Sequence, residues 1–95
     1  MKNNEEEITG KRLKELRIER DLTMDMVINT INEWQNLGLT RGNLSRWESG
    51  KNTPSLFNLK LLAKFYGVSI DYLAGLTNTR TPVYLLTKNK RCKKE

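Results

Sequence analysis

The stretch that decides the fold is residues 39–51, which read LTRGNLSRWESGK. Thr40 suits a helix N-cap, because its hydroxyl can accept a hydrogen bond from a first-turn N–H that has no helical partner. Gly50 stands where a helix of about two and a half turns would end, a position that glycine favours. The pattern predicts a short helix over residues 41–49 and raises the question of what its polar side faces.

On a helical wheel, with about 100° per residue, Leu44 and Trp47 fall together and define the inward direction. The opposite side carries only small, polar or cationic residues, which are Arg41, Gly42, Ser45 and Arg46, with Asn43 at its border. Arginine can hold a guanine edge or a phosphate with two hydrogen bonds at once. A slim helix of this kind, preceded by a supporting helix and a turn, is typical of helix-turn-helix geometry.

Gly42 has two interpretations at this stage. A glycine inside a helix costs about 1 kcal/mol relative to alanine, although the cost is smaller near a helix end. It is therefore either a neutral surface residue or a place where the missing side chain lets the backbone approach a partner closely.

Four further helices are predicted around this one. The first covers residues 11–20, after Thr9 and Gly10, with Leu13 and Leu16 on one face. The next begins after Thr23 and reaches as far as residue 36. Its apolar residues follow i, i+3, i+4, i+7 spacing and are Met24, Val27, Ile28 and Ile31, with the pattern continuing to Trp34.

The last two helices follow the loop at residues 51–55. Ser55 caps a helix over residues 56–66, which ends at Gly67. We expect it to bury a broad stripe formed by Leu56, Leu59, Leu62, Ala63, Phe65 and Tyr66. Ser69 caps a short helix over residues 70–74, closed by Gly75. The prediction is an all-α domain over residues 9–75, with a flexible acidic N-terminus (1–8). A linker, a short irregular or β-like apolar arm (83–87) and a basic tail (88–95) make up residues 76–95.

Composition excludes several classes. No segment approaches the ~18 apolar residues of a membrane span, and the N-terminus lacks the apolar stretch of a signal peptide. The chain has no histidine and one cysteine, Cys92, which predicts no metal site, no internal disulfide and no cofactor. The net charge of +6 favours a polyanionic partner, although a solvated basic surface would explain the charge equally well.

The stretches GKRLKELRIERDLT (10–23), LSRWESGK (44–51), TPS (53–55) and GVSIDYL (67–73) resemble the lambda-repressor-like (XRE) helix-turn-helix family of phage and bacterial regulators. The resemblance implies a five-helix DNA-binding domain. It also implies base-reading roles for Arg41, Gly42 and Arg46, with Asn43 and Ser45 beside them. The phosphate contacts that it implies are Thr23, Thr40, Ser49 and Lys51, to which we add Lys11 and Asn52. It pairs Arg17 with Glu48 as a structural link and leaves Leu44 and Trp47 in the core.

This chain departs from the family pattern at three places. Met24 stands where the family usually has a glutamine that touches DNA, and Ile28 stands where a small residue usually allows close helix packing. The segment NEWQNL (32–37) is extra, and we expect an extended second helix whose Trp34 and Leu37 cover the base of the third helix. The insert is either an extension of the core or a surface for a regulatory protein partner.

The sequence therefore predicts a transcriptional repressor that binds a pseudo-palindromic double-stranded DNA operator as a homodimer. The cytoplasm of a bacterial cell or phage-infected host, on nucleoid DNA, is the expected location. Apolar residues near the end of the chain are candidates for self-association, namely Ile70, Tyr72, Leu73, Val83, Tyr84 and Leu85. The alternative is an antitoxin-type module that binds a partner protein and regulates its own gene secondarily. Nothing in the sequence organises an enzyme reaction.

Overall fold

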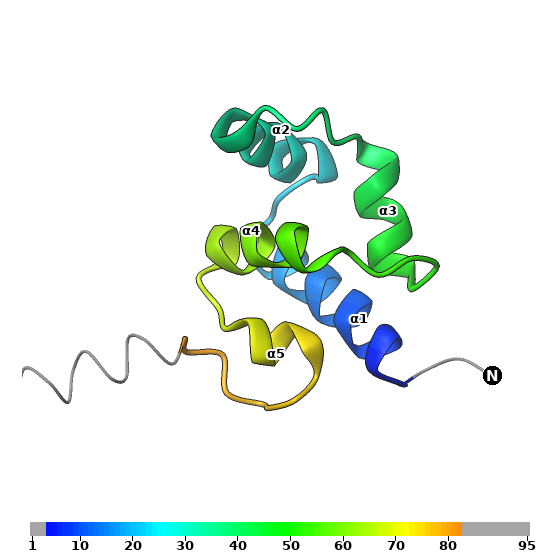
Figure 1. Cartoon of the computed structure of the whole chain (residues 1–95), viewed down its shortest axis with the longest axis vertical. Coiled ribbons are helices and arrows are strands. Elements are labelled where there is room, and N and C mark those ends of the chain that lie inside the picture. The colour runs from blue at the N-terminus through cyan, green and yellow to red at the C-terminus, as the bar shows by residue number, and fades with distance from the viewer. Residues whose placement is uncertain (1–3, 83–95) are drawn as a thin grey trace, which may run out of the picture.

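The computed structural model describes the backbone of residues 4–82 and the side chains of residues 8–82. This part of the chain forms five helices, which are α1 (Asn4–Glu19), α2 (Met24–Gln35), α3 (Arg41–Ser49), α4 (Leu56–Tyr66) and α5 (Ile70–Ala74). Figure 1 shows α1 running diagonally through the molecule, with α2, α3 and α4 around one side of it and α5 below. The predicted all-α, five-helix architecture is confirmed.

Each helix from α2 onward starts at the predicted hydroxyl residue. The side chains of Thr23, Thr40, Ser55 and Ser69 accept hydrogen bonds from the backbone three residues later. The caps satisfy N–H groups that have no partner inside the helix. At the other ends, Asn36, Gly50, Gly67 and Gly75 adopt the left-handed conformation that closes a helix.

The first helix begins at Asn4 and not at residue 11, so the predicted start was wrong. Gly10 was treated as a boundary but lies inside α1 and is buried. A Cβ at Gly10 would lie 2.5 Å from the carbonyl oxygen of Trp47 and 2.8 Å from that of Glu48. The glycine is therefore required by the close approach of α1 to the last turn of α3.

The core is formed by one continuous cluster of apolar side chains from all five helices. Its members without measurable exposure are Leu13, Leu16, Val27, Leu44 and Leu73. The stripe predicted on α4 is wrong at one position, because Leu56 is 67% exposed at the first turn. Leu61, which lay outside the predicted stripe, is buried instead, since α4 is covered on two sides, by α2 and by α5.

Residues 76–82, the C-terminal strap, were predicted as a linker but fold back onto the domain. The Arg12 guanidinium donates to the carbonyl oxygen of Thr77 and to the side chain of Asn78, both at 2.7 Å. Arg80 forms a two-point ion pair with Glu19 at 3.0 and 2.8 Å. The domain that carries the site therefore extends to Pro82. The apolar arm and the basic tail predicted after it lie outside the described residues.

The close contact at Gly10 gives a stability prediction. Gly10→Ala should lower the free energy of unfolding by about 1 to 3 kcal/mol, because its methyl group meets backbone atoms that can move only if the helices separate. Chemical denaturation measures the loss.

Gly42→Ala is the matched control, because a Cβ there would meet no backbone atom: its nearest neighbours are the exposed Arg46 guanidinium at 3.3 Å and the Thr40 hydroxyl oxygen at 3.6 Å. It should leave stability unchanged or raise it by up to about 1 kcal/mol through helix propensity. Equal effects of the two substitutions would contradict the role assigned to Gly10.

Candidate nucleic-acid interface

Hydrogen bonds to the residues just before α3 hold the start of this helix in place. The side-chain amide of Asn32 in α2 donates to the carbonyl oxygen of Leu39 and accepts from its N–H, both at 2.9 Å. Thr40 and Asn43 then form a reciprocal cap, in which Thr40 N donates to Asn43 Oδ1 at 2.8 Å and Asn43 N donates to Thr40 Oγ1 at 3.2 Å. Sequence reasoning missed Asn32, because an asparagine in the last turn of a helix carries no signal for a contact seven residues further along the chain.

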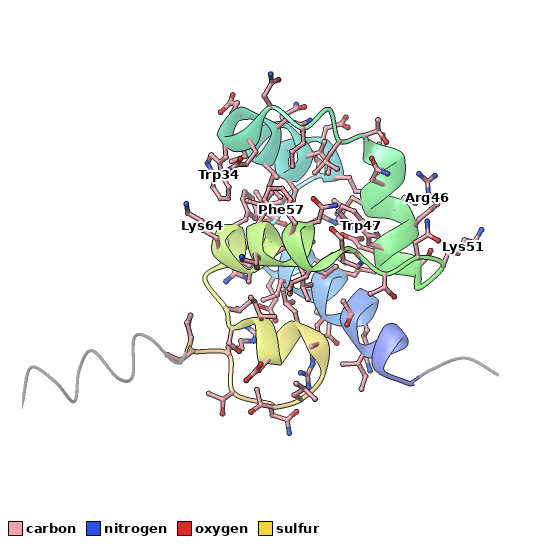
Figure 2. All side chains as sticks on the ribbon, in the orientation of Figure 1. Trp34, Arg46, Trp47, Lys51, Phe57 and Lys64 are labelled. Carbon is pink, nitrogen blue, oxygen red and sulfur yellow. The ribbon has the colours of Figure 1, made fainter. Side chains whose placement is uncertain are left out.

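The two sides of α3 differ as the helical wheel indicates. Leu44 is fully buried and Trp47 is 6% exposed. Arg41, Ser45 and Arg46 are exposed on the other side, and Figure 2 shows Arg46 pointing away from the body of the domain. We call Arg41, Gly42, Ser45 and Arg46 the reading face, after the base-reading role that the family resemblance predicts for this side of the helix.

Gly42 lies beneath the Arg46 side chain. A Cβ on Gly42 would lie 3.3 Å from one terminal nitrogen of the Arg46 guanidinium. Arg46 therefore extends back along the helix over the space that the glycine leaves, as helical side chains commonly do. This contact gives Gly42 a third interpretation, because the residue makes room for an arginine of its own helix.

The buried ion pair between Arg17 and Glu48 links α1 to the end of α3. The Arg17 Nε and Nη2 atoms donate to the two carboxylate oxygens at 2.7 and 3.0 Å, and the side chains are 14% and 3% exposed. The hydrogen bond to Glu48 raises the pKa of Arg17 above its usual value. Glu48 is the sole acidic residue of α3, so its inward position and its pairing leave the outer side of this helix purely cationic.

The loop after α3 is hydrogen-bonded to the last turn of the helix. The carbonyl oxygen of Arg46 accepts from the backbone N–H groups of Lys51 and Asn52 at 3.0 and 3.3 Å. The Ser49 hydroxyl donates to the same oxygen at 3.1 Å. Lys51 is exposed beside Arg46 at the lower end of α3, so its ammonium group extends the positive surface beyond the helix.

The side chains predicted to contact phosphates differ in their exposure and in the hydrogen bonds that they already make within the protein. Lys11, Lys51 and Asn52 have exposed side chains. The Thr23 hydroxyl accepts from Met26 N, which leaves its proton for a phosphate oxygen. The hydroxyls of Thr40 and Ser49 instead donate inside the protein, to Asn43 and Arg46.

The structure shows what the side chains do at two of the departures from the family pattern, Met24 and Trp34. Met24 is half-buried against the core, so its side chain serves packing. Trp34 lies against α4 and not at the base of α3, so this prediction was wrong: its ring centroid is 6.0 Å from that of Phe65, and the Lys64 ammonium lies 5.4 Å from the Trp34 ring. Figure 2 places Trp34 and Lys64 together, on the side away from α3. Leu37, which was predicted to cover the base of α3 together with Trp34, is 38% exposed.

The candidates for self-association separate into three groups. Tyr72 and Leu73 are buried within the domain, so they are unavailable to a second chain, and that part of the prediction was wrong. Ile70 is half-buried. Val83, Tyr84 and Leu85 lie outside the described residues.

Within the part of the chain that the structure describes, no cluster of three or more histidine, cysteine, aspartate or glutamate side chains could hold a metal ion. None of the helices between residues 4 and 82 has the length and apolar character needed to cross a membrane.

The packing of α2 against α3 and the outward basic face of α3 define a helix-turn-helix domain. Residues 35–73 match the family model described as Helix-turn-helix. This part of the chain carries a helix-turn-helix of the lambda-repressor-like (XRE) kind, which is found in DNA-binding transcription regulators. No solved structure gives a significant match to the chain.

Three curated proteins illustrate the relationship. The HTH-type transcriptional activator BcrR of Enterococcus faecalis is 35% identical over 64 residues, which cover 67% of this chain and 28% of BcrR. The HTH-type transcriptional regulator YobD of Bacillus subtilis is 34% identical over 71 residues, 75% of this chain and 58% of YobD. The cryptic phage CTXphi transcriptional repressor RstR of Vibrio cholerae is 35% identical over 77 residues, 81% of this chain and 64% of RstR. The chain thus spans less than two thirds of each of these relatives.

The ion pair that holds α3 gives a second prediction. Glu48→Ala should lower the free energy of unfolding by about 2 to 4 kcal/mol, because it leaves the Arg17 guanidinium largely buried without its anion. Thermal and chemical denaturation measure this loss. Glu19→Ala, which breaks the exposed ion pair with Arg80, is the control and should change stability little. A similar loss in both variants would contradict the importance given to the buried pair.

Proposed function

We propose that the chain is a sequence-specific repressor that binds a pseudo-palindromic operator in double-stranded DNA. The observation that carries the proposal is the outer side of α3, which presents Arg41 and Arg46 with no exposed acid between them. An α-helix with these side chains fits the major groove, where arginine pairs with the O6 and N7 atoms of guanine. The proposed site of action is the cytoplasm of a bacterial cell or a phage-infected host, on nucleoid DNA.

Within this proposal, the residues divide into two roles. The reading face supplies base contacts, with Asn43 at its edge, and determines sequence preference. Phosphate contacts position the helix on the duplex and come from Thr23, Lys51, Asn52 and Lys11. The hydroxyls of Thr40 and Ser49 join them only by exchanging their internal hydrogen bonds for phosphate oxygens.

The α2 and α3 N-termini add backbone N–H groups to this surface. Each helix begins with N–H groups that have no partner inside the helix, and its dipole favours an anion there. The side chain after the α2 cap belongs to Met24, which packs inward. The N-terminus of α2 therefore offers a phosphate its backbone and Thr23, without the side-chain contact that the family usually adds.

We propose that two copies bind one operator. A single α3 of nine residues contacts only a few base pairs, and dimers of such domains read two half-sites about one helical turn apart. A small domain bound over a promoter blocks access to it without further contacts, which fits the repressor role. The match to RstR, a protein named as a transcriptional repressor, covers 81% of this chain and supports the same choice.

The test compares two cationic residues that lie next to each other on the surface. Operator sites are first selected from random DNA with the full chain. Arg46→Ala should then weaken binding to the selected site by about 1 to 3 kcal/mol and relax the preference at one base pair, because a bidentate base contact is lost. Affinity for random DNA should change much less.

Lys51→Ala is the matched control, because it removes one positive charge beside Arg46 without touching the reading face. It should weaken binding to all sequences alike and reduce the salt dependence by about one ion. Equal losses on selected and random DNA for Arg46→Ala would contradict its reading role. A complex mass corresponding to one chain per operator would contradict the proposed dimer.

A further inference from the structure

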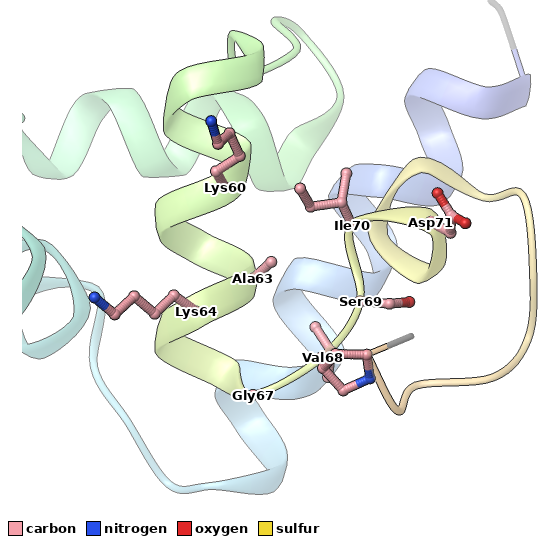
Figure 3. A pocket seen from close by; sticks show the side chains of 9 residues that line it. Lys60, Ala63, Lys64, Gly67, Val68, Ser69, Ile70 and Asp71 are labelled. Atoms are coloured by element: carbon pink, nitrogen blue, oxygen red, sulfur yellow. The ribbon is translucent and has the colours of Figure 1, made fainter. Parts of the chain in front are cut away.

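An open groove lies between the second half of α4 and the start of α5 (Figure 3). Its volume is about 440 Å³. The floor and walls are mostly apolar and include Ala63, Val68, Ile70 and Pro82, while Lys60 and Lys64 extend outward from α4 at one edge. Apolar surface of this kind is favourably removed from water when a complementary segment covers it.

The C-terminal strap runs along α5 and ends at this groove. Ser69 N donates to the carbonyl oxygen of Arg80 at 2.7 Å, and the Ser69 hydroxyl donates to that of Thr79 at 3.3 Å. Two residues later Pro82 is buried and lines the groove itself. The strap is therefore fixed at the groove wall up to Pro82, its last described residue. The next residues read VYLLT, which form the apolar arm (83–87).

We propose that the apolar arm occupies the α4–α5 groove of its own chain. Four apolar residues span at most about 14 Å when extended, and the groove runs along α4 from Gly67 to Lys60, seven residues or about 10 Å of helix. The length of the arm therefore matches the groove. A segment tethered directly at its site has an effective concentration of the order of millimolar, so a separate chain competes poorly for the same surface.

Geometry argues against a second copy as the occupant, and this step alone rests on the proposed function. Lys64, at the groove, lies on the opposite side of the view from Arg46 and Lys51 (Figure 2). Two chains joined through their grooves would direct their reading faces away from each other, and these could not meet one stretch of duplex. The apolar arm predicted for self-association, together with Ile70, is thereby assigned to packing within one chain.

The charges around the groove favour the apolar arm as its occupant and exclude the basic tail that follows. Lys60 and Lys64 are exposed along the α4 edge of the groove and outnumber the one acid among its lining residues, Asp71 on α5. The basic tail (88–95) carries five lysines and arginines. Like charges repel, so the tail gains nothing by continuing along α4. We expect the chain to leave the groove after the arm.

Disulfide trapping in the full chain tests the proposal. Cys92→Ser removes the native thiol, and Ile70→Cys is combined with either Leu85→Cys or Leu86→Cys. Neighbouring residues of an extended segment point to opposite sides, so at least one pair should reach the 4.4–6.8 Å Cα separation of a disulfide. Under mild oxidation that pair should form an intramolecular disulfide at least tenfold faster than a control pair, Ser45→Cys with Leu85→Cys.

A mixing experiment identifies whose arm is bound. The single-cysteine variants Ile70→Cys and Leu85→Cys, both with Cys92→Ser, are oxidised together, and the same is done with Leu86→Cys. Few cross-linked heterodimers should form. Efficient heterodimer formation would overturn the proposal in favour of a second copy, and cross-linking of both double-cysteine pairs at the rate of the control pair would overturn it altogether. No DNA is present, so a failure of the intrachain contact is distinguished from a failure of operator binding, which the Arg46 and Lys51 variants test separately.

A stability measurement gives an independent readout. In the full chain, Leu85→Ser with Leu86→Ser should lower the melting temperature by about 5 °C or more, because a domain of this size shifts by about 4–8 °C per kcal/mol. The matched control, Lys88→Ser with Asn89→Ser, should stay within the error of the measurement. An unchanged melting temperature in the leucine variant would overturn the proposal.

Discussion

The guanidinium of Arg17 on α1 fixes the positions of α3 and of the turn into α2 relative to α1. It makes two hydrogen bonds to the Glu48 carboxylate in α3 and a third, at 3.0 Å, to the carbonyl oxygen of Leu22 before α2. One rigid cationic fork therefore joins α1, the turn into α2 and the end of α3. Breaking such a buried pair on one side is costly, because the remaining charge loses its solvation and its partner together.

Gly10 is the steric counterpart of this ion pair. The carbonyl groups of Trp47 and Glu48 press against the bare backbone of α1 at this residue, so the two helices approach as closely as the missing side chain allows. The same residue, Glu48, is thus held by its backbone on one side of the contact and by its carboxylate on the other. The last turn of α3 is consequently held by α1 in two ways, and the cationic side chains on the outer side of the helix extend from a rigid support.

Local signals in the sequence were sufficient for most of the fold. The hydroxyl residues at Thr23, Thr40, Ser55 and Ser69 start helices because capping needs only the residue itself and the next turn. The inward side of α3 was also predictable, since Leu44 and Trp47 are the only large apolar residues on it. These features depend on interactions within a few positions along the chain.

The features that sequence reasoning missed depend on distant partners. Gly10 appeared to be a helix boundary because its reason for being glycine lies on α3. Trp34 was assigned to the wrong helix, since an aromatic residue in a polar segment indicates burial but not which neighbour covers it. The strap appeared to be a linker because its anchors, Arg12 and Glu19, lie about sixty residues earlier in the chain. The assigned DNA contacts remain predictions, because they concern a partner outside the protein.

The extra segment 32–37 supplies the last turn of α2, which ends at Gln35, and the start of the loop that leads to α3. Its first residue, Asn32, binds both backbone groups of Leu39, so the start of α3 is tied to a fixed point of α2, whatever length of chain lies between. The added turn extends past this point toward α4, where Trp34 packs on Phe65. Figure 1 shows the connecting loop returning from that end of α2 to α3. The insertion therefore adds a contact between α2 and α4 through Trp34, which stays 40% exposed, while Asn32 ties the start of α3 to α2.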